Sequence, residues 1–188
     1  MPPDLHQLLK RAANGGDPRG LPATFGALLR VPQDYRQYTV AQRATAIWVL
    51  ARTGESRAVP ILLASLASRS PEIRGAAARG LGELGILKPG VVESLIKRLR
   101  RDSEAPVREA AAYALGLLGD RAALSPLLQT VANRKEVERV RTMATEAVVD
   151  LAASSAIIEL ERILVSVGSH SALENEIRSA ILRLKELP

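Results

Sequence analysis

Cysteine is absent from the 188-residue sequence, and histidine occurs only as His6 and His170. Without cysteine the chain has no disulfide, no thiolate metal ligand and no cysteine nucleophile. Neither histidine belongs to a cluster with metal-ligand spacing. Ser169-His170-Ser171 is typical of a solvated turn rather than of a nucleophile and its base, and no carboxylate pair can be assigned acid and base roles. The sequence therefore predicts no catalytic residue, no metal site and no cofactor.

Aromatic residues make up only 3% of the chain, although 47% of it is hydrophobic. We therefore expect a core of alanine, leucine and valine packed between closely spaced helices. The scarcity of aromatics also weighs against binding of single-stranded nucleic acid, because such proteins stack bases on aromatic rings. No apolar run reaches transmembrane length, and the first residues lack the apolar segment of a signal peptide. We expect a cytoplasmic protein with no membrane span.

Small residues dominate the segment VREAAAYALGLLGD at 107–120. Its apolar positions recur on one helix face, and they are Val107, Ala110, Ala111, Ala114, Leu115 and Leu118. Pro106 fits the first turn of a helix, where its missing N–H costs nothing. Gly119 suits the left-handed position that ends a helix, and Asp120 can cap the next one. The segment predicts a helix whose small side chains let a neighbouring backbone approach closely.

The same pattern recurs along the chain at intervals of 31 to 37 residues. Each copy carries an arginine one residue after an apolar stripe position, and the five arginines are Arg43, Arg74, Arg108, Arg141 and Arg178. A second apolar helix is predicted between the copies, at 59–67, 91–100, 124–132 and 157–165. A two-helix unit repeated at this period indicates a solenoid.

The repeated unit contains an apolar-Arg pair followed by Ala, Ala-Leu-Gly, Leu-Gly-Asp and a second leucine-rich helix. This pattern, found over about residues 39–188, resembles the short HEAT-like repeat of the phycobilisome lyases. The resemblance implies an all-α, right-handed α-solenoid of about five two-helix repeats with divergent end caps. We expect a single solenoid domain over 1–188, with a divergent N-terminal repeat at 1–38, regular repeats at 39–171 and a C-terminal capping helix at 172–188.

The five in-register arginines lie at the edge of the predicted buried face. An aliphatic stem can pack there while the guanidinium reaches a carbonyl or carboxylate of the adjoining repeat. Because the pattern of the resembled family carries this arginine as part of its framework, we expect a structural, inter-repeat role for all five.

Five residues after each arginine lies a position about 125° away from the centre of the stripe. Its occupants vary in size and charge, and they are Trp48, Arg79, Tyr113, Glu146 and Arg183. Trp48, Arg79 and Tyr113 have the composition of a binding hot spot. The alternative is that the two aromatic rings simply cover neighbouring helices.

Positive charge is concentrated in the first part of the chain. Residues 1–102 hold 16 basic and 8 acidic residues, whereas 103–188 hold 10 and 12. The densest run is 97–101, where Lys97 and Arg101 share one helix face, Arg98 flanks it and Arg100 points elsewhere. Such a run can simply oppose the helix dipole and solvate the surface, and an arginine-rich balance can reflect genome composition. It can also form a basic patch for an acidic partner.

We therefore expect a non-catalytic scaffold or adaptor that binds another protein, with an acidic surface, along the second helices of the repeats. Glu93, Lys97, Arg98 and Arg101 would lie at the centre of that surface. One alternative is a subunit resembling a phycobilin lyase, which attaches or detaches a tetrapyrrole. A less favoured alternative is a HEAT-like protein that binds duplex nucleic acid. The scarcity of histidine argues against the iron-binding hydroxylases built from similar repeats, and the sequence indicates no oligomeric state.

Overall fold

The computed structural model describes residue 30 and residues 38–151, 154–167 and 171–186. Within these ranges the regular secondary structure is helical and contains no strand, which confirms the all-α prediction. The described residues also contain no helix that is long and apolar enough to cross a membrane. The N-terminal repeat predicted over 1–38, both histidines and the Ser169-His170 pair fall outside these ranges, apart from Arg30 and Tyr38.

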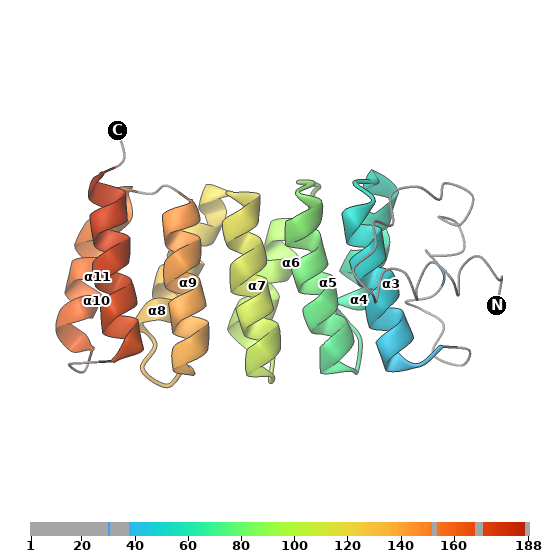
Figure 1. The fold of residues 1–188 in the computed structure, drawn as a ribbon, viewed down its shortest axis with the longest axis horizontal. Helices are drawn as coiled ribbons and strands as arrows, with labels where there is room; N and C mark the ends of the chain where they lie inside the picture. Colours follow the sequence, from blue (N-terminus) through green and yellow to red (C-terminus); the bar gives the residue numbers. More distant parts are fainter. Residues whose placement is uncertain (1–29, 31–37, 152–153, 168–170, 187–188) are drawn as a thin grey trace. The chain divides into compact units, whose positions relative to one another are not determined.

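The chain divides into two compact units, Met1–Val91 and Val92–Pro188. In the first unit, α3 (Val40–Arg52) packs against α5 (Pro71–Leu84). A 3-10 turn, η2 (Ser56–Ala58), leads into α4 (Val59–Ser65), which packs against α5 as well (Figure 1). The organisation of the whole chain as one solenoid domain stays a prediction.

Local sequence signals set the ends of the helices in the first unit. Thr39 caps α3, accepting a hydrogen bond from the main-chain N–H of Gln42, while the Gln42 side chain accepts one from the Thr39 N–H. This reciprocal capping box satisfies two donors that a helix start leaves open. Ser70 caps α5 by accepting a hydrogen bond from the Ile73 N–H, without a reciprocal bond. Gly85 ends α5 with a φ of 65°, a left-handed conformation that glycine adopts without steric cost.

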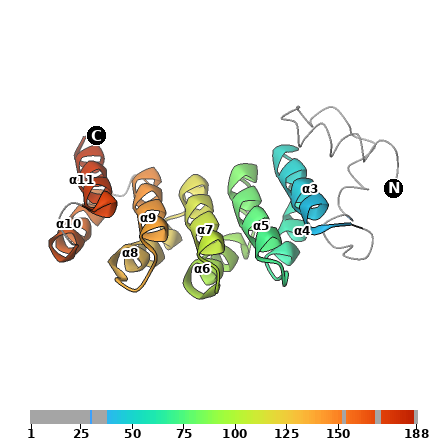
Figure 2. The same ribbon diagram turned by 60° about the horizontal axis from the view of Figure 1, so that its bottom comes forward.

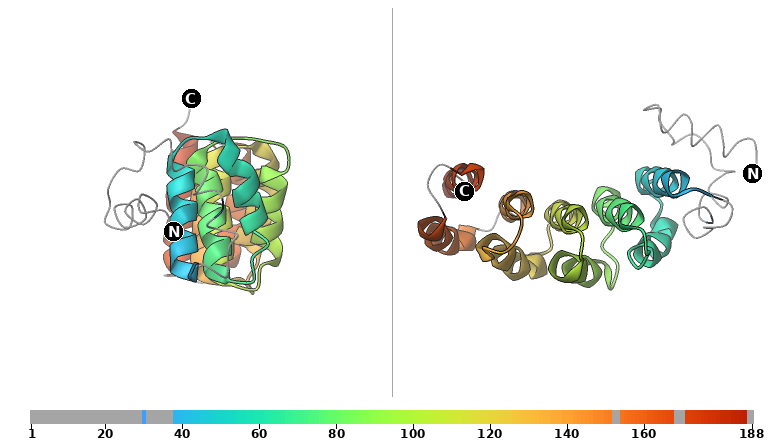
Figure 3. Two further views of the ribbon diagram at one scale, coloured as in Figure 1. Left: turned by 90° about the vertical axis from the view of Figure 1, so that its right-hand side faces the viewer. Right: turned by 90° about the horizontal axis from the view of Figure 1, so that it is seen from below.

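The second unit contains the remaining helices in two layers. The elements in chain order are α6 (Val91–Arg101), α7 (Ala105–Leu118), η3 (Arg121–Ala123), α8 (Leu124–Ala132), α9 (Glu138–Asp150), η4 (Ser154–Ala156), α10 (Ile157–Ser166) and α11 (Ala172–Lys185). Within this unit α9 packs between α7 and α11. Figures 2 and 3 show α7, α9 and α11 in one row, which we call the first-helix layer, and α6, α8 and α10 in the other, the second-helix layer.

The alanine-rich stripe on α7 is buried as predicted. All six of its apolar residues are at most 9% exposed, and Ala111 and Ala114 are fully buried. Gly116 lies on the same helix, where a Cβ atom would stand 2.9 Å from Ala147 Cα on α9. The backbones of α7 and α9 therefore approach closely at Gly116, which is not one of the stripe positions. A close approach at Ala111 and Ala114 stays a prediction.

The predicted helix ends around α7 and α8 are also present. Pro106 lies in the first turn of α7, and Gly119 ends the helix with a φ of 67°. The Asp120 side chain accepts a hydrogen bond from the Ala122 N–H at 2.8 Å. Asp120 thus caps the 3-10 turn η3, which runs directly into α8, rather than α8 itself.

The C-terminal helix α11 has one buried face. Its buried residues are Leu173, Ile177, Ala180, Ile181 and Leu184, and α11 packs against both α9 and α10. Its opposite side is mostly polar, although Leu182 is 63% exposed. These features fit the proposed capping role of 172–188.

Candidate interaction surfaces

Three of the in-register arginines bind main-chain carbonyls that precede their own helix. Arg74, which is buried, donates from Nη1 to the carbonyls of Ser68 and Arg69. Arg108 donates from Nη1 to the carbonyls at 102 and 103, at 2.7 and 3.0 Å. Arg141 donates from Nε to the Val131 carbonyl, and burial lowers the pKa of its guanidinium. In these three copies the guanidinium satisfies carbonyls at the end of a second helix or in the loop that follows it.

Arg108 makes an additional contact that spans two repeats. Its guanidinium forms two hydrogen bonds with the Glu136 carboxylate in the loop between α8 and α9. The side chains of Arg108 and Glu136 are only 15% and 8% exposed. Burial acts to raise the pKa of Glu136, but the hydrogen bond from Arg108 and one from the Val137 N–H outweigh it, so this pKa lies below its ordinary value. The hydrogen bond to Glu136 raises the pKa of Arg108.

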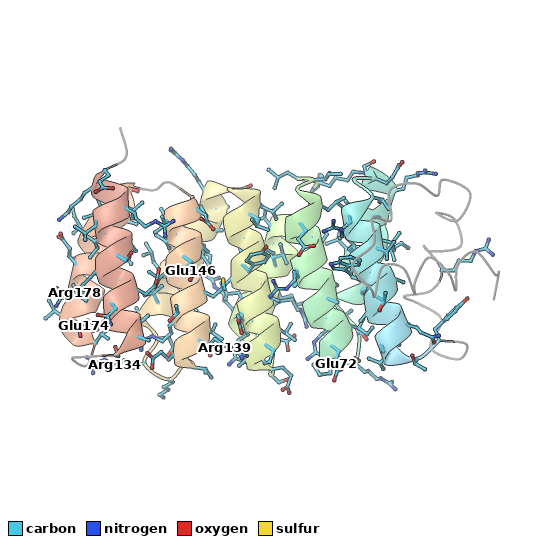
Figure 4. The ribbon with its side chains drawn as sticks, viewed as in Figure 1. Glu72, Arg134, Arg139, Glu146, Glu174 and Arg178 are labelled. Carbon is cyan, nitrogen blue, oxygen red and sulfur yellow. The ribbon has the colours of Figure 1, made fainter. Side chains whose placement is uncertain are left out.

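The other two arginines of the series have different surroundings. Arg178 pairs with Glu174, one turn earlier in α11, and its side chain is 60% exposed (Figure 4). Arg43 is half-buried and lines a hollow with Ser68, Arg69 and Ser70 in the first unit. The structural, inter-repeat role expected for the five arginines stays a prediction.

The predicted basic surface lies on α6. Glu93, Lys97 and Arg101 are exposed. Lys97 and Arg101 form no hydrogen bond or ion pair with any residue that the structure describes. Arg98 is different, because it is half-buried and pairs with the Asp102 carboxylate at 3.2 Å. Glu93 lies in the first turn of α6, where a negative charge is favoured by the helix dipole.

Arg100, which the sequence predicts to point away from the face of Lys97 and Arg101, reaches toward α8 in the same layer. Its Nη2 donates to Gln129 Oε1 on α8 at 2.8 Å. The Gln129 amide in turn donates to Ser125 Oγ at 3.4 Å. This chain of hydrogen bonds joins the basic helix α6 to the outer surface of α8.

A hollow of about 410 Å³ lies on the second-helix layer at α8 and α10. Its lining residues are Arg121, Leu124, Ser125, Leu128, Gln129, Ala132 and Glu159. Leu124 and Leu128 are half-buried and follow each other at one-turn spacing with Ala132, so they form an apolar floor. The hollow cannot be predicted from the sequence, because an apolar helix face indicates burial and not a partly open depression.

The residues predicted as a binding hot spot, five positions after the arginines, lie on the first helices of both units. In the first unit, Trp48 is half-buried with the Arg52 guanidinium carbon 4.9 Å from its ring centroid, and Arg79 is exposed. In the second unit, Tyr113 and Glu146 are half-buried on α7 and α9. Tyr113 therefore lies on the first-helix layer, whereas Lys97 and Arg101 lie on the second. The structure does not bring these predicted binding residues together on one helix layer, and their role in recognition stays a prediction.

Glu146 lies on α9, in the first-helix layer (Figure 4). Burial, followed by the charges of Glu176 and Asp150, raises the pKa of Glu146 above its ordinary value, while Arg183 opposes them. Nearby, Arg139 pairs with Glu109 on α7. Among the described residues, no group of three histidine, cysteine or carboxylate side chains is arranged to hold a metal ion.

Comparisons with known proteins agree on the type of repeat. A family model of HEAT repeats matches residues 37–116 and 92–169. The structure is similar to a chain of the complex of CpcE and CpcF of phycocyanin lyase from Nostoc sp. PCC7120, with 26% identity and a TM-score of 0.65. The match covers 84% of this chain but only 65% of the lyase chain.

Two designed proteins have similar folds. A designed armadillo repeat protein in complex with the peptide (KR)4 has 19% identity and a TM-score of 0.70, covering 96% of this chain and 91% of that one. Computationally designed armadillo repeat proteins for modular peptide recognition give 18% identity and a TM-score of 0.62, covering 95% and 91%. At these identities the likeness concerns the fold alone. A search of curated proteins found no match.

Proposed function

Because the chain belongs to the HEAT-repeat family, we propose that it is a non-catalytic scaffold or adaptor that binds another protein. The binding surface is the second-helix layer of the second unit, formed by α6, α8 and α10. Repeat arrays of this kind present long surfaces rather than enclosed pockets, which suits recognition of a protein.

The observation that carries this proposal is that Lys97 and Arg101 are two neighbouring cations without a partner among the described residues. Both are exposed, both lie on one face of α6, and neither is paired with a described residue. In the same unit Arg108, Arg139 and Arg178 have carboxylate partners, whereas the exposed Arg121 has none among the described residues. Two adjacent unpaired cations attract an acidic surface and speed its association. The partner is therefore a protein with an acidic patch.

The test compares charge reversals on the two layers. A pull-down with mass spectrometry from the native lysate identifies the partner, and its affinity is then measured against ionic strength. Lys97→Glu combined with Arg101→Glu is expected to weaken binding at low salt on the order of tenfold, mainly through slower association, and to reduce the salt dependence. The melting temperature should barely change, because exposed charges contribute about 0–1 kcal/mol.

The matched control is Arg178→Glu combined with Arg183→Glu on α11, which changes the net charge by the same amount on the first-helix layer. Equal weakening by both pairs would show that only net charge matters and would reject the surface on α6. If the partner is duplex DNA, the logarithmic salt slope should flatten by about 0.9 for each phosphate that the variant no longer neutralises.

A second candidate function is that of a lyase subunit. The similarity to the phycocyanin lyase complex over 84% of this chain favours it. The test is to mix the purified chain, alone and with apo-phycocyanin, with a free bilin and to record the visible absorbance. A shifted bilin band that depends on the chain would support the lyase function, whereas an unchanged spectrum would leave the scaffold function in place.

A further inference from the structure

The hollow at α8 and α10 has an apolar floor, and polar and charged side chains stand around it. Leu124, Leu128 and Ala132 form the floor, and Ser125 and Gln129 stand on the wall nearest α6. The hollow has a volume of about 410 Å³ and is open to solvent on its outer side. It is large enough to receive a bulky aliphatic side chain.

The charged groups at the hollow favour an anionic occupant. Among the described residues that line it, the one carboxylate is that of Glu159, which already accepts a hydrogen bond from Arg162 at 2.8 Å. Arg121, on the same hollow, is exposed and forms no side-chain hydrogen bond or ion pair with a described residue. Arg100 reaches the wall through Gln129 and has further N–H donors to offer. The unsatisfied charge at the hollow is therefore positive.

We propose that this hollow binds a short acidic segment of a partner protein, with a leucine-like side chain on the Leu124–Leu128 floor and a neighbouring carboxylate on Arg121. The inference rests on the proposed function, and it adds the sequence chemistry that the partner must present. An aliphatic side chain anchors the segment by burial, and the adjacent carboxylate fixes its orientation through a charge-assisted hydrogen bond.

The probe is a fluorescein-labelled octapeptide with a central pair of leucines and three glutamates on each side, and binding is followed by fluorescence anisotropy. Saturable binding to the full chain is expected. Replacing the two leucines by serines should weaken binding by about tenfold or more, because the aliphatic side chains are no longer there to be buried. Equal binding of the serine peptide would overturn the proposal, since it would show that charge alone attracts the probe. Absence of saturable binding up to millimolar peptide would overturn it too.

Variants of the exposed Ser125 separate the hollow from the rest of the surface. Ser125→Trp fills the hollow and should weaken peptide binding by about tenfold or more, whereas Ser125→Ala leaves it open and should have little effect. Arg121→Glu should also weaken binding. Unchanged binding by Ser125→Trp, with an unchanged melting temperature, would overturn the proposal.

The proposed function and the hollow can fail separately. If the charge reversal on α6 weakens binding of the native partner while Ser125→Trp has no effect on it, the scaffold function stands and the hollow is not its anchor. A concentration-dependent dimer of the chain that Ser125→Trp abolishes would also overturn the proposal, because a second copy would then occupy the hollow.

Discussion

Arg108 on α7 and Glu136 in the loop before α9 form a bidentate ion pair. The Nε–Oε2 distance is 2.8 Å, and the Nη2–Oε1 distance is 2.7 Å. The same guanidinium also donates to the carbonyls at 102 and 103. The Arg108 side chain thus joins the loop between α6 and α7 to the loop between α8 and α9.

Arg108→Lys is expected to lower the free energy of unfolding by about 1–3 kcal/mol. Lysine keeps the charge, but it cannot form both parallel hydrogen bonds and reach the two carbonyls as well. Denaturant unfolding measures the change. Arg178→Lys is the control, because the Arg178–Glu174 pair lies within one helix and its arginine is 60% exposed. Equal effects of the two substitutions would reject the bridging role of Arg108.

Glu146→Gln is expected to stabilise the protein slightly at pH 7, because it removes a carboxylate whose ionised form is disfavoured in the folded chain. Burial and the neighbouring Glu176 and Asp150 raise the pKa of Glu146 in the folded chain. Its ionised form is therefore unfavourable above that pKa, and the penalty disappears once pH falls below the ordinary value of 4.5. The stability that Glu146→Gln adds should therefore shrink as the pH falls through the raised pKa of Glu146 and vanish below 4.5.

Thermal melts of wild type and Glu146→Gln between pH 4 and pH 7.5 measure this pH dependence. Glu93→Gln serves as the control, since it removes an exposed carboxylate from the first turn of α6 and should lower stability slightly. A gain from Glu146→Gln that stays constant down to pH 4 would contradict the raised pKa.

Gly116→Ala is expected to destabilise the chain by about 1–3 kcal/mol, although the same change in an open helix stabilises it by roughly 0.5–1 kcal/mol. The new methyl group would stand 2.9 Å from Ala147 Cα, which is backbone and cannot move aside cheaply. At Gly80 the nearest atom is the Ala51 methyl at 3.2 Å, so Gly80→Ala should cost less. Chemical denaturation measures both, and a stabilised Gly116→Ala would show that α7 and α9 do not approach this closely.

Deletion of 172–188 removes α11 and should make the protein aggregate or unfold over a broad range. The deletion exposes the faces of α9 and α10 that α11 covers, and repeat arrays need polar ends to stay in solution. Size-exclusion chromatography and thermal melting measure the effect, with removal of 186–188 alone as the control. A monomeric truncated chain with an unchanged melting transition would show that α11 is not a cap.

The periodic features of this fold could be predicted from the sequence. The stripe around Ala111, the left-handed Gly119 and the proline-containing helix starts are local signals, and each fixes a helix face or a helix end. Their recurrence indicates a two-helix solenoid, and the resemblance of the repeated unit to a known family indicates the HEAT-like type. Burial of the stripe could be predicted from the spacing of its small and apolar residues alone.

The interactions between distant residues could not be predicted in this way. Glu136 is 28 residues from Arg108 and belongs to a loop without periodicity, so nothing in the pattern selects it as a partner. Arg98 and Arg100 look equally exposed in the sequence, yet Arg98 pairs with Asp102 and Arg100 reaches Gln129. The depth of the hollow at α8 depends on how side chains of two helices meet, which repeat spacing does not determine.

Binding of the partner on the second-helix layer is tested most directly by single cysteines, because the chain contains none of its own. Ser125→Cys places a thiol on α8, and Ser179→Cys places one on α11. Both serines are exposed in the structure. The rate of maleimide labelling is measured with and without the partner recovered by pull-down. The account predicts several-fold slower labelling at position 125 in the complex and no change at position 179. Protection at 179 with none at 125 would contradict it.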